Sequence, residues 1–196
     1  MEPGPLDLAA NERLSADPVL GPVVRQNGIM TVSPASDVFK RLAKAIVRQQ
    51  ISMNAADSIF AKLETTVSLT PAAVCERPTE DLTAAGLSQT KAHALSELSE
   101  KWTENGWHRD YFLGLENDEI CEVLTEVRGI GPWTADMALI FCFGRPDVFP
   151  DSDLGIRNAM KALLGEQRPR TELRSIASNW QPYRSYAALH LWHYVD

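Results

Sequence analysis

The chain has 196 residues with an ordinary globular composition, 44% hydrophobic and 23% charged, and a net charge of −7. No apolar run approaches the ~20 residues that a membrane-spanning helix needs, and residues 1–10 lack the basic and apolar segments of a signal peptide, so we expect an intracellular protein without membrane contact. The acidic charge weighs against a nucleic-acid partner, because phosphate binding usually draws on excess Lys and Arg, although backbone amides at helix starts hold phosphate without adding charge.

Apolar residues recur at the helical period in almost every segment, as at positions 39, 42, 43, 46 and 47. The expected helices begin, in chain order, at Asp17–Pro18, Ser36, Ser52, Thr70–Pro71, Ser88, Asn117, Trp133, Asp153, Thr171 and Pro182. Gly144 and Gly165 are expected to end the helices that start at Trp133 and Asp153. The β-branched alternation that is typical of strands is missing. These patterns predict an all-α protein of about ten helices.

The thiols and imidazoles show no metal-ligand pattern. Cys75, Cys121 and Cys142 lie far apart without C-x-x-C spacing, which argues against structural zinc and against a cluster held by four thiolates. The histidines are interpreted as surface or helix-packing residues; they are His93, His108, His190 and His193.

The stretch from Leu124 to Ala135 predicts a helix, a tight turn and a second helix. The first helix ends at Val127, and Gly129 and Gly131 then flank a β-branched residue, which permits positive φ and leaves room for a close-approaching group. The amides that start the second helix point outward beside its positive dipole end. The turn alone is compatible equally with a phosphate site and with a plain helix–turn–helix connection.

A second informative stretch runs from Val148 to Gly155 and contains Asp153 at a predicted helix start. An aspartate there is most often only an N-cap, because its oxygen accepts an otherwise unpaired helix amide. Capping is nevertheless compatible with catalysis, since a carboxylate that accepts helix amides stays ionised. A fixed anion is what a cationic glycosidic transition state requires nearby.

Together these motifs resemble the helix-hairpin-helix (HhH-GPD) DNA glycosylase superfamily, and within it the 3-methyladenine DNA glycosylase II type. The resemblance rests on G-I-G-P-W-T-A at 129–135 and F-G-R-P-D-V-F-P-x-x-D-L-G at 143–155, with supporting matches at 45–52, 85–92 and 180–192. It covers the chain from roughly residue 38 to the end. It implies two helical lobes with a central cleft: residues 38–145, with the hairpin at about 124–135, and residues 1–37 together with 146–196.

The resemblance also implies roles for individual residues. Asp153 matches the catalytic aspartate, and Trp133 stands where the bifunctional glycosylase/lyases carry a lysine that forms an imine. Trp133, Met137 and Trp192 match the base pocket, Met137 replacing a tyrosine that is common in this branch. The DNA contacts that the resemblance and the surrounding loops indicate are Gln49, Gln50, Ile51, Ser52, Lys91, Arg128, Gly129, Ile130, Gly131 and Thr134. The carbonyls of Thr125, Val127 and Ile130 match the ligands of a monovalent cation, Na⁺ or K⁺.

We therefore expect a monofunctional glycosylase that excises alkylated purines such as 3-methyladenine and 7-methylguanine from double-stranded DNA. Such bases are positively charged, and indole faces attract cations by ~0.5–2 kcal/mol; aromatics at helical spacing are, however, more often core residues. No organic cofactor is implied, and we expect a monomer in the cytoplasm, or in the nucleus of a eukaryote. The alternatives are a non-catalytic DNA-binding module, a glycosylase for ethenoadenine or oxidised purines, and a small-molecule enzyme, which only the acidic charge favours.

Overall fold

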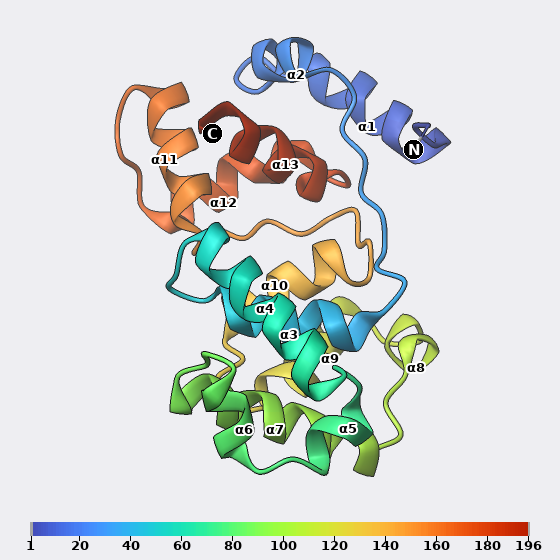
Figure 1. Cartoon of the computed structure of the whole chain (residues 1–196). Coiled ribbons are helices and arrows are strands. Elements are labelled where there is room, and N and C mark those ends of the chain that lie inside the picture. The colour runs from blue at the N-terminus through green and yellow to red at the C-terminus, as the bar shows by residue number, and fades with distance from the viewer. Residues whose placement is uncertain (1, 196) are drawn as a thin grey trace. The chain divides into compact units, whose positions relative to one another are not determined.

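The computed structural model describes residues 2–195 (Figure 1). All regular structure in that range is helical, and no strand occurs within it, which confirms the predicted all-α class. The described residues contain thirteen α-helices and one 3-10 helix, more than the ten expected. The three additional helices are α1 (Pro5–Ser15), α6 (Thr79–Ala84) and α8 (Arg109–Leu113). Helices α6 and α8 have only six and five residues, too few for a visible hydrophobic period, and the apolar residues of α1 do not gather on one face.

The helices fall into two compact units, residues 35–143 and residues 1–34 with 144–196. We call residues 35–143 the hairpin unit; it contains α3 (Val38–Arg48), α4 (Met53–Val67), α5 (Pro71–Cys75), α6 (Thr79–Ala84), α7 (Gln89–Glu104), α8 (Arg109–Leu113), α9 (Asn117–Thr125) and α10 (Pro132–Phe141). The other, the terminal unit, contains α1 (Pro5–Ser15), α2 (Gly21–Asn27), α11 (Leu154–Leu164), α12 (Arg170–Ala177), the 3-10 helix η1 (Ser178–Trp180) and α13 (Arg184–Val195).

The core of the hairpin unit is organised around α3. Its apolar residues at the helical period are all buried, and the helix packs against α4, α7 and α10. Burying one aliphatic or aromatic side chain contributes about 1.5–3 kcal/mol, so this one face anchors three neighbouring helices. The ring of Trp102 lies edge-on to Phe39 and beside Phe112, which joins α7 to α3 and α8.

In the terminal unit, segments from both ends of the chain share one core. The first two helices pack against α13, and α11 packs along α13 (Figure 1). Trp180 and Tyr186 are the largest fully buried side chains there. Tyr186 also donates a hydrogen bond to Asp7 of α1 (2.8 Å), so the N-terminal helix is fixed by a polar contact as well as by apolar packing.

Four of the predicted helix starts are confirmed as side-chain caps, and the exceptions have simple causes. Side-chain caps are present at Ser52, Thr70, Ser88 and Asp153. Helix α9 begins at Asn117, as predicted, with Glu116 at its N-cap. The prediction at Ser36 was wrong by one residue, since Asp37 occupies the N-cap position.

Helix α2 starts at Gly21 and not after Asp17, because the Asp17 carboxylate accepts the amides of Val19 and Leu20 and so holds a separate turn. The last two helices begin at Arg170 and Arg184 instead of at Thr171 and Pro182, and α10 ends at Phe141, two residues earlier than predicted. Among residues 2–195, no helix has the length and apolar character that crossing a membrane requires.

Candidate nucleic-acid interface and catalytic carboxylate

The two glycines of the hairpin turn have different structural roles. Gly129 has φ +91°, and a Cβ there would lie 2.9 Å from the Cβ of Ala94 on α7, so both its conformation and its packing require glycine. Gly131 has φ −94° and ψ 177°, an extended conformation that any residue adopts. The prediction of positive φ therefore holds for Gly129 only. At Gly131 the missing side chain leaves open space, with no atom within 4 Å of an added Cβ.

The turn presents unused backbone donors. Within residues 2–195 the amides of Gly129 and Gly131 donate to no acceptor, and no side chain caps α10, which begins at Pro132. Ile130 differs, because its amide donates to the Val127 carbonyl at 3.0 Å and its side chain is buried. The arrangement of open amides at a helix start suits an anion such as a phosphate.

Gln49 fastens the loop between α3 and α4 to this turn. Its side-chain amide donates to the Gly129 carbonyl at 2.9 Å and to the Thr134 hydroxyl at 3.1 Å. The Thr134 side chain is buried, so Gln49 and Thr134 connect parts of the protein to each other, and only the backbone of Thr134 remains for a DNA contact. No local pattern could have revealed this tether, because Gln49 lies 80 residues from Gly129 and 85 residues from Thr134 in the chain.

The rest of that loop is exposed. Gln50 has φ +58°, which is unusual for a residue with a side chain, and both Gln50 and Ile51 face solvent. Ser52 then caps α4 by accepting the Ala55 amide. Met53, which the sequence analysis did not single out, is 65% exposed directly after this cap. Side chains of this loop are therefore available for insertion into a partner, as the resemblance implies.

The two predicted basic contacts differ in availability. The Lys91 ammonium donates to the Val47 carbonyl at 2.7 Å, and burial lowers the pKa of Lys91. That side chain satisfies the carboxyl end of α3. Arg128 is exposed and forms no ion pair with any described residue, so its guanidinium remains available for a phosphate.

The carbonyls expected to bind a monovalent cation fit that role by their hydrogen bonding. The carbonyls of Thr125 and Ile130 accept no hydrogen bond from the described residues, and the Val127 carbonyl accepts one, leaving a second lone pair. Oxygen ligands of this kind suit a hard cation. The nearby pocket candidates Trp133 and Met137 lie one turn apart on α10; the indole is partly buried and the methionine is buried.

In the terminal unit Asp153 caps α11 and receives a second hydrogen bond. Its Oδ1 atom accepts the Ile156 amide and the Trp192 indole N–H, both at 2.9 Å. The interpretation of Asp153 as a helix N-cap is thus confirmed. Trp192 was expected as a wall of a base pocket, and the structure shows its N–H bound to the carboxylate, which is a contact that the sequence analysis did not anticipate.

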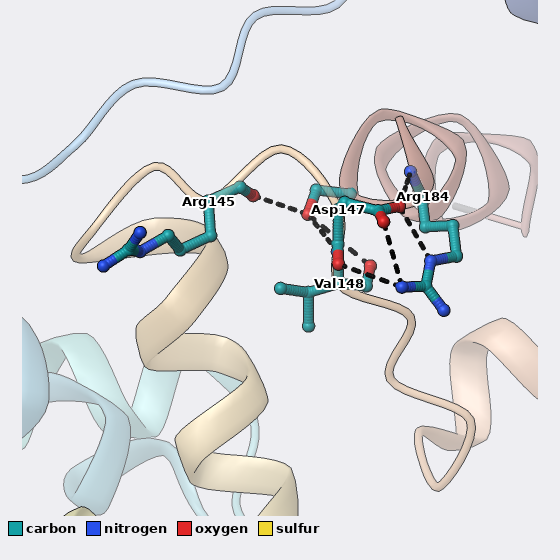
Figure 2. A network of polar contacts seen from close by, with 5 residues as sticks. Arg145, Asp147, Val148 and Arg184 are labelled. Carbon is teal, nitrogen blue, oxygen red and sulfur yellow. Dashed lines mark hydrogen bonds and ion pairs between the residues drawn. The ribbon is translucent and has the colours of Figure 1, made fainter. Parts of the chain in front are cut away.

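The loop that leads to Asp153 is held at its start by α13 (Figure 2). The Arg184 guanidinium donates to both carboxylate oxygens of Asp147, at 2.7 and 3.0 Å. The buried Ser185 hydroxyl donates to the Arg145 carbonyl at 2.6 Å and accepts the Val148 amide at 3.0 Å. A bidentate pair and a shared hydroxyl together fix the backbone of this segment.

Closer to Asp153, the loop is held by α12. Asp151 is 4% exposed and pairs with Arg170 at 2.6 Å and with Arg174. Burial alone would raise the pKa of Asp151, but the hydrogen bonds from the two guanidiniums outweigh it and hold this pKa below its ordinary value. Asp151 therefore stays ionised and keeps the loop attached just before the candidate catalytic residue.

The acidic charge that argued against DNA is unevenly distributed. Residues 76–136 carry thirteen of the 26 acidic side chains and five of the 19 basic ones. The remainder of the chain is close to balanced. The net charge of −7 therefore describes mainly the segment from the end of α5 to the middle of α10 and does not represent the whole surface.

Comparison with known proteins gives consistent matches. The model of the HhH-GPD superfamily base excision DNA repair proteins matches residues 43–183. DNA-3-methyladenine glycosylase 1 of Schizosaccharomyces pombe is 32% identical over 162 residues, which cover 79% of this chain and 71% of that protein. The DNA-3-methyladenine glycosylase of Saccharomyces cerevisiae is 32% identical over 182 residues, 82% of this chain, but the match spans only 60% of that protein.

The fold is shared with a solved DNA complex. The structure of the S. pombe 3-methyladenine DNA glycosylase Mag1 with abasic DNA superimposes with a TM-score of 0.84 at 28% identity. The superposition covers 94% of this chain and 95% of that one. The similarity therefore extends over nearly the whole of both proteins.

Proposed function

Because this chain belongs to the HhH-GPD superfamily of base excision DNA repair proteins, we propose that it is a monofunctional DNA glycosylase that hydrolyses the N-glycosidic bond of alkylated purines. Its substrates are double-stranded DNA bases such as 3-methyladenine and 7-methylguanine. The names of the yeast relatives and the abasic-DNA complex of a structural neighbour support this substrate class.

The observation that carries the proposal is the anchored carboxylate of Asp153. It caps α11 and accepts the Trp192 indole N–H. It also ends a loop that is attached to α12 by the Asp151–Arg170 ion pair and to α13 by the Asp147–Arg184 ion pair. A fixed anion stabilises the oxocarbenium-like sugar that forms as the glycosidic bond breaks, and it orients the attacking water. Alkylated purines leave readily because they carry positive charge, so no separate acid has to protonate the base.

The hairpin unit supplies the DNA contacts. The open amides of Gly129 and Gly131 hold phosphate, Arg128 adds a cation, and the carbonyls of Thr125, Val127 and Ile130 would hold Na⁺ or K⁺ beside the turn. The bound cation would add positive charge close to the phosphate. Eversion of the damaged nucleotide costs a few kcal/mol, and the exposed side chains of the loop at 50–51 occupy the space it leaves.

The reaction ends at the abasic site. Trp133 lies in the first turn of α10, and residues 124–135 contain no lysine. An indole has no amine to attack the anomeric carbon, so no imine forms and no β-elimination follows. The chemistry requires water and a carboxylate, without an organic cofactor.

The proposal is tested by incubating the protein with duplex DNA that carries 3-methyladenine or 7-methylguanine and measuring the released base by mass spectrometry. We expect free base, intact strands until alkali is added, and no covalent complex when borohydride is present. Affinity for the damaged duplex without base release would instead indicate a non-catalytic binding module. A borohydride-trapped complex would contradict the monofunctional assignment, and release of ethenoadenine in preference to methylated bases would change the substrate class.

A further inference from the structure

Trp192 does more than offer an aromatic face. Its indole N–H donates to Oδ1 of Asp153 at 2.9 Å, the same oxygen that accepts the Ile156 amide at 2.9 Å. One donor comes from the helix that Asp153 caps and the other from α13 (Figure 1). We propose that the Trp192 N–H is a positioning group that holds the Asp153 carboxylate in its reactive orientation, and that Gly155 makes room for this contact.

Two donors fix the carboxylate better than the cap alone. A helix amide restrains one oxygen but leaves the side chain free to rotate about the hydrogen bond. A second donor from a different helix removes that freedom, and hydrogen bonds to an ionised acceptor are stronger and shorter than neutral ones. Displacing a catalytic group by about 1 Å costs roughly 100-fold in rate, so orientation at this oxygen matters for catalysis.

Gly155 is the second observation. A Cβ on Gly155 would lie 3.1 Å from Asp153 Oδ1, 3.1 Å from Trp192 Cδ1 and 3.4 Å from Trp192 Nε1. The backbone conformation of Gly155 is that of an ordinary helical residue, so backbone freedom does not explain a glycine there. The absent side chain instead leaves the space through which the indole edge reaches the carboxylate.

The indole is held independently of Asp153. Trp192 is partly buried and packs against the apolar core of the terminal unit, which also contains Ile156 and Leu191. The donor is therefore in place before any substrate binds, which is the arrangement that positioning a catalytic group requires.

The contact itself is tested on the protein without DNA. The chain has five tryptophans, so a ¹⁵N spectrum of the indole N–H groups identifies Trp192 as the resonance that Trp192→Phe removes. We expect Asp153→Ala to shift this resonance and to speed its exchange with water. Asp37→Ala is the matched control, because Asp37 also caps a helix, α3, and accepts no indole N–H. A Trp192 resonance that responds equally to both variants would overturn the contact.

The positioning role rests on the proposed function and is tested by single-turnover base release. Trp192→Phe keeps an aromatic face but loses the N–H together with part of the ring surface, and Gly155→Ala keeps the whole indole but crowds it. We expect both variants to release base about 10–100-fold more slowly than the wild type, with affinity for abasic-analogue duplex within twofold and little change in thermal stability.

The outcomes separate the two claims. If the wild type releases base and Trp192→Phe releases it at the same rate, the positioning role is overturned, Trp192 acts only as a wall of the base pocket, and the proposed function stands. A wild type that releases no base would end the proposed function, and the positioning role with it. A loss of affinity equal to the loss of rate would also overturn positioning, because it would show that the indole acts in binding.

Discussion

Adding one methyl group at each hairpin glycine should distinguish the glycine that the turn needs for DNA binding from the glycine that it needs for stability. In Gly131→Ala the new Cβ enters open space at an ordinary φ of −94°, so the free energy of unfolding should stay constant or rise by about 0.4–1 kcal/mol. In Gly129→Ala the residue keeps a φ of +91°, which costs about 1–2 kcal/mol. Its Cβ also lies 2.9 Å from that of Ala94, so the backbone of one helix must shift.

The loss of DNA affinity should follow the opposite order, because Gly131→Ala, which leaves stability intact, should weaken binding. If the Gly131 amide binds phosphate, a methyl group beside it keeps the backbone away and removes a hydrogen bond to a charged partner, worth about 1.5–3 kcal/mol. Affinity for abasic-analogue duplex should then fall at least tenfold in Gly131→Ala. Thermal unfolding measures the change in stability of each variant, since about 1 kcal/mol shifts the unfolding midpoint by roughly 2–4 °C at this chain length.

One result would contradict the expected loss of DNA affinity, and another would contradict the expected loss of stability. A folded Gly131→Ala protein that binds DNA as tightly as the wild type would show that no phosphate approaches this turn. A Gly129→Ala protein as stable as Gly131→Ala would show that the positive φ and the contact with Ala94 do not constrain the hairpin.

The other predictions concern the buried His190, the hydrogen bond from Gln49 to Thr134 and the buried Cys142. Burial, and to a smaller extent His193, lowers the pKa of His190 to about 4. Because the unfolded chain then takes up a proton at higher pH than the folded protein, the free energy of unfolding should fall by about 3 kcal/mol as pH drops from 6.5 towards 4. Denaturant unfolding should show this loss in the wild type and not in His190→Gln. Gln49→Ala leaves the buried Thr134 hydroxyl without its donor, which should cost about 1–3 kcal/mol and speed amide exchange in the turn, and unchanged exchange would argue against the tether. Cys142 is buried with a pKa raised to about 12, so iodoacetamide should modify the exposed Cys75 well before Cys142 by mass spectrometry, and equal labelling would contradict the burial.

The helical architecture was predictable because it depends on short-range patterns. Residues such as Ser52 and Asp153 cap the next helix through their own side chains, so their roles can be recognised within a few positions of the chain. The one-residue error at Ser36 arose because Ser36 and Asp37 stand side by side and either of them can cap. Only the packing of the helix decides between such neighbours.

The contacts that organise the candidate site were less predictable because they join distant segments. Gln49 reaches the hairpin from 80 residues away, and Trp192 reaches Asp153 across 39 residues. Neither spacing produces a local pattern. The resemblance identified Trp192 through its aromatic ring, whereas the structure shows that its N–H is also used. The two hairpin glycines were predicted to permit positive φ and to leave room for an approaching group; only Gly129 has a positive φ, and a Cβ added at Gly131 meets open space.

The central claim is that the charge of Asp153 accelerates base release. Asp153→Asn preserves an oxygen that caps α11 and accepts the Trp192 N–H, and it removes the negative charge. Single-turnover release of 3-methyladenine from duplex DNA should fall by about 100-fold or more, with unchanged affinity for abasic-analogue duplex. Release by Asp153→Asn at close to the wild-type rate would contradict the account.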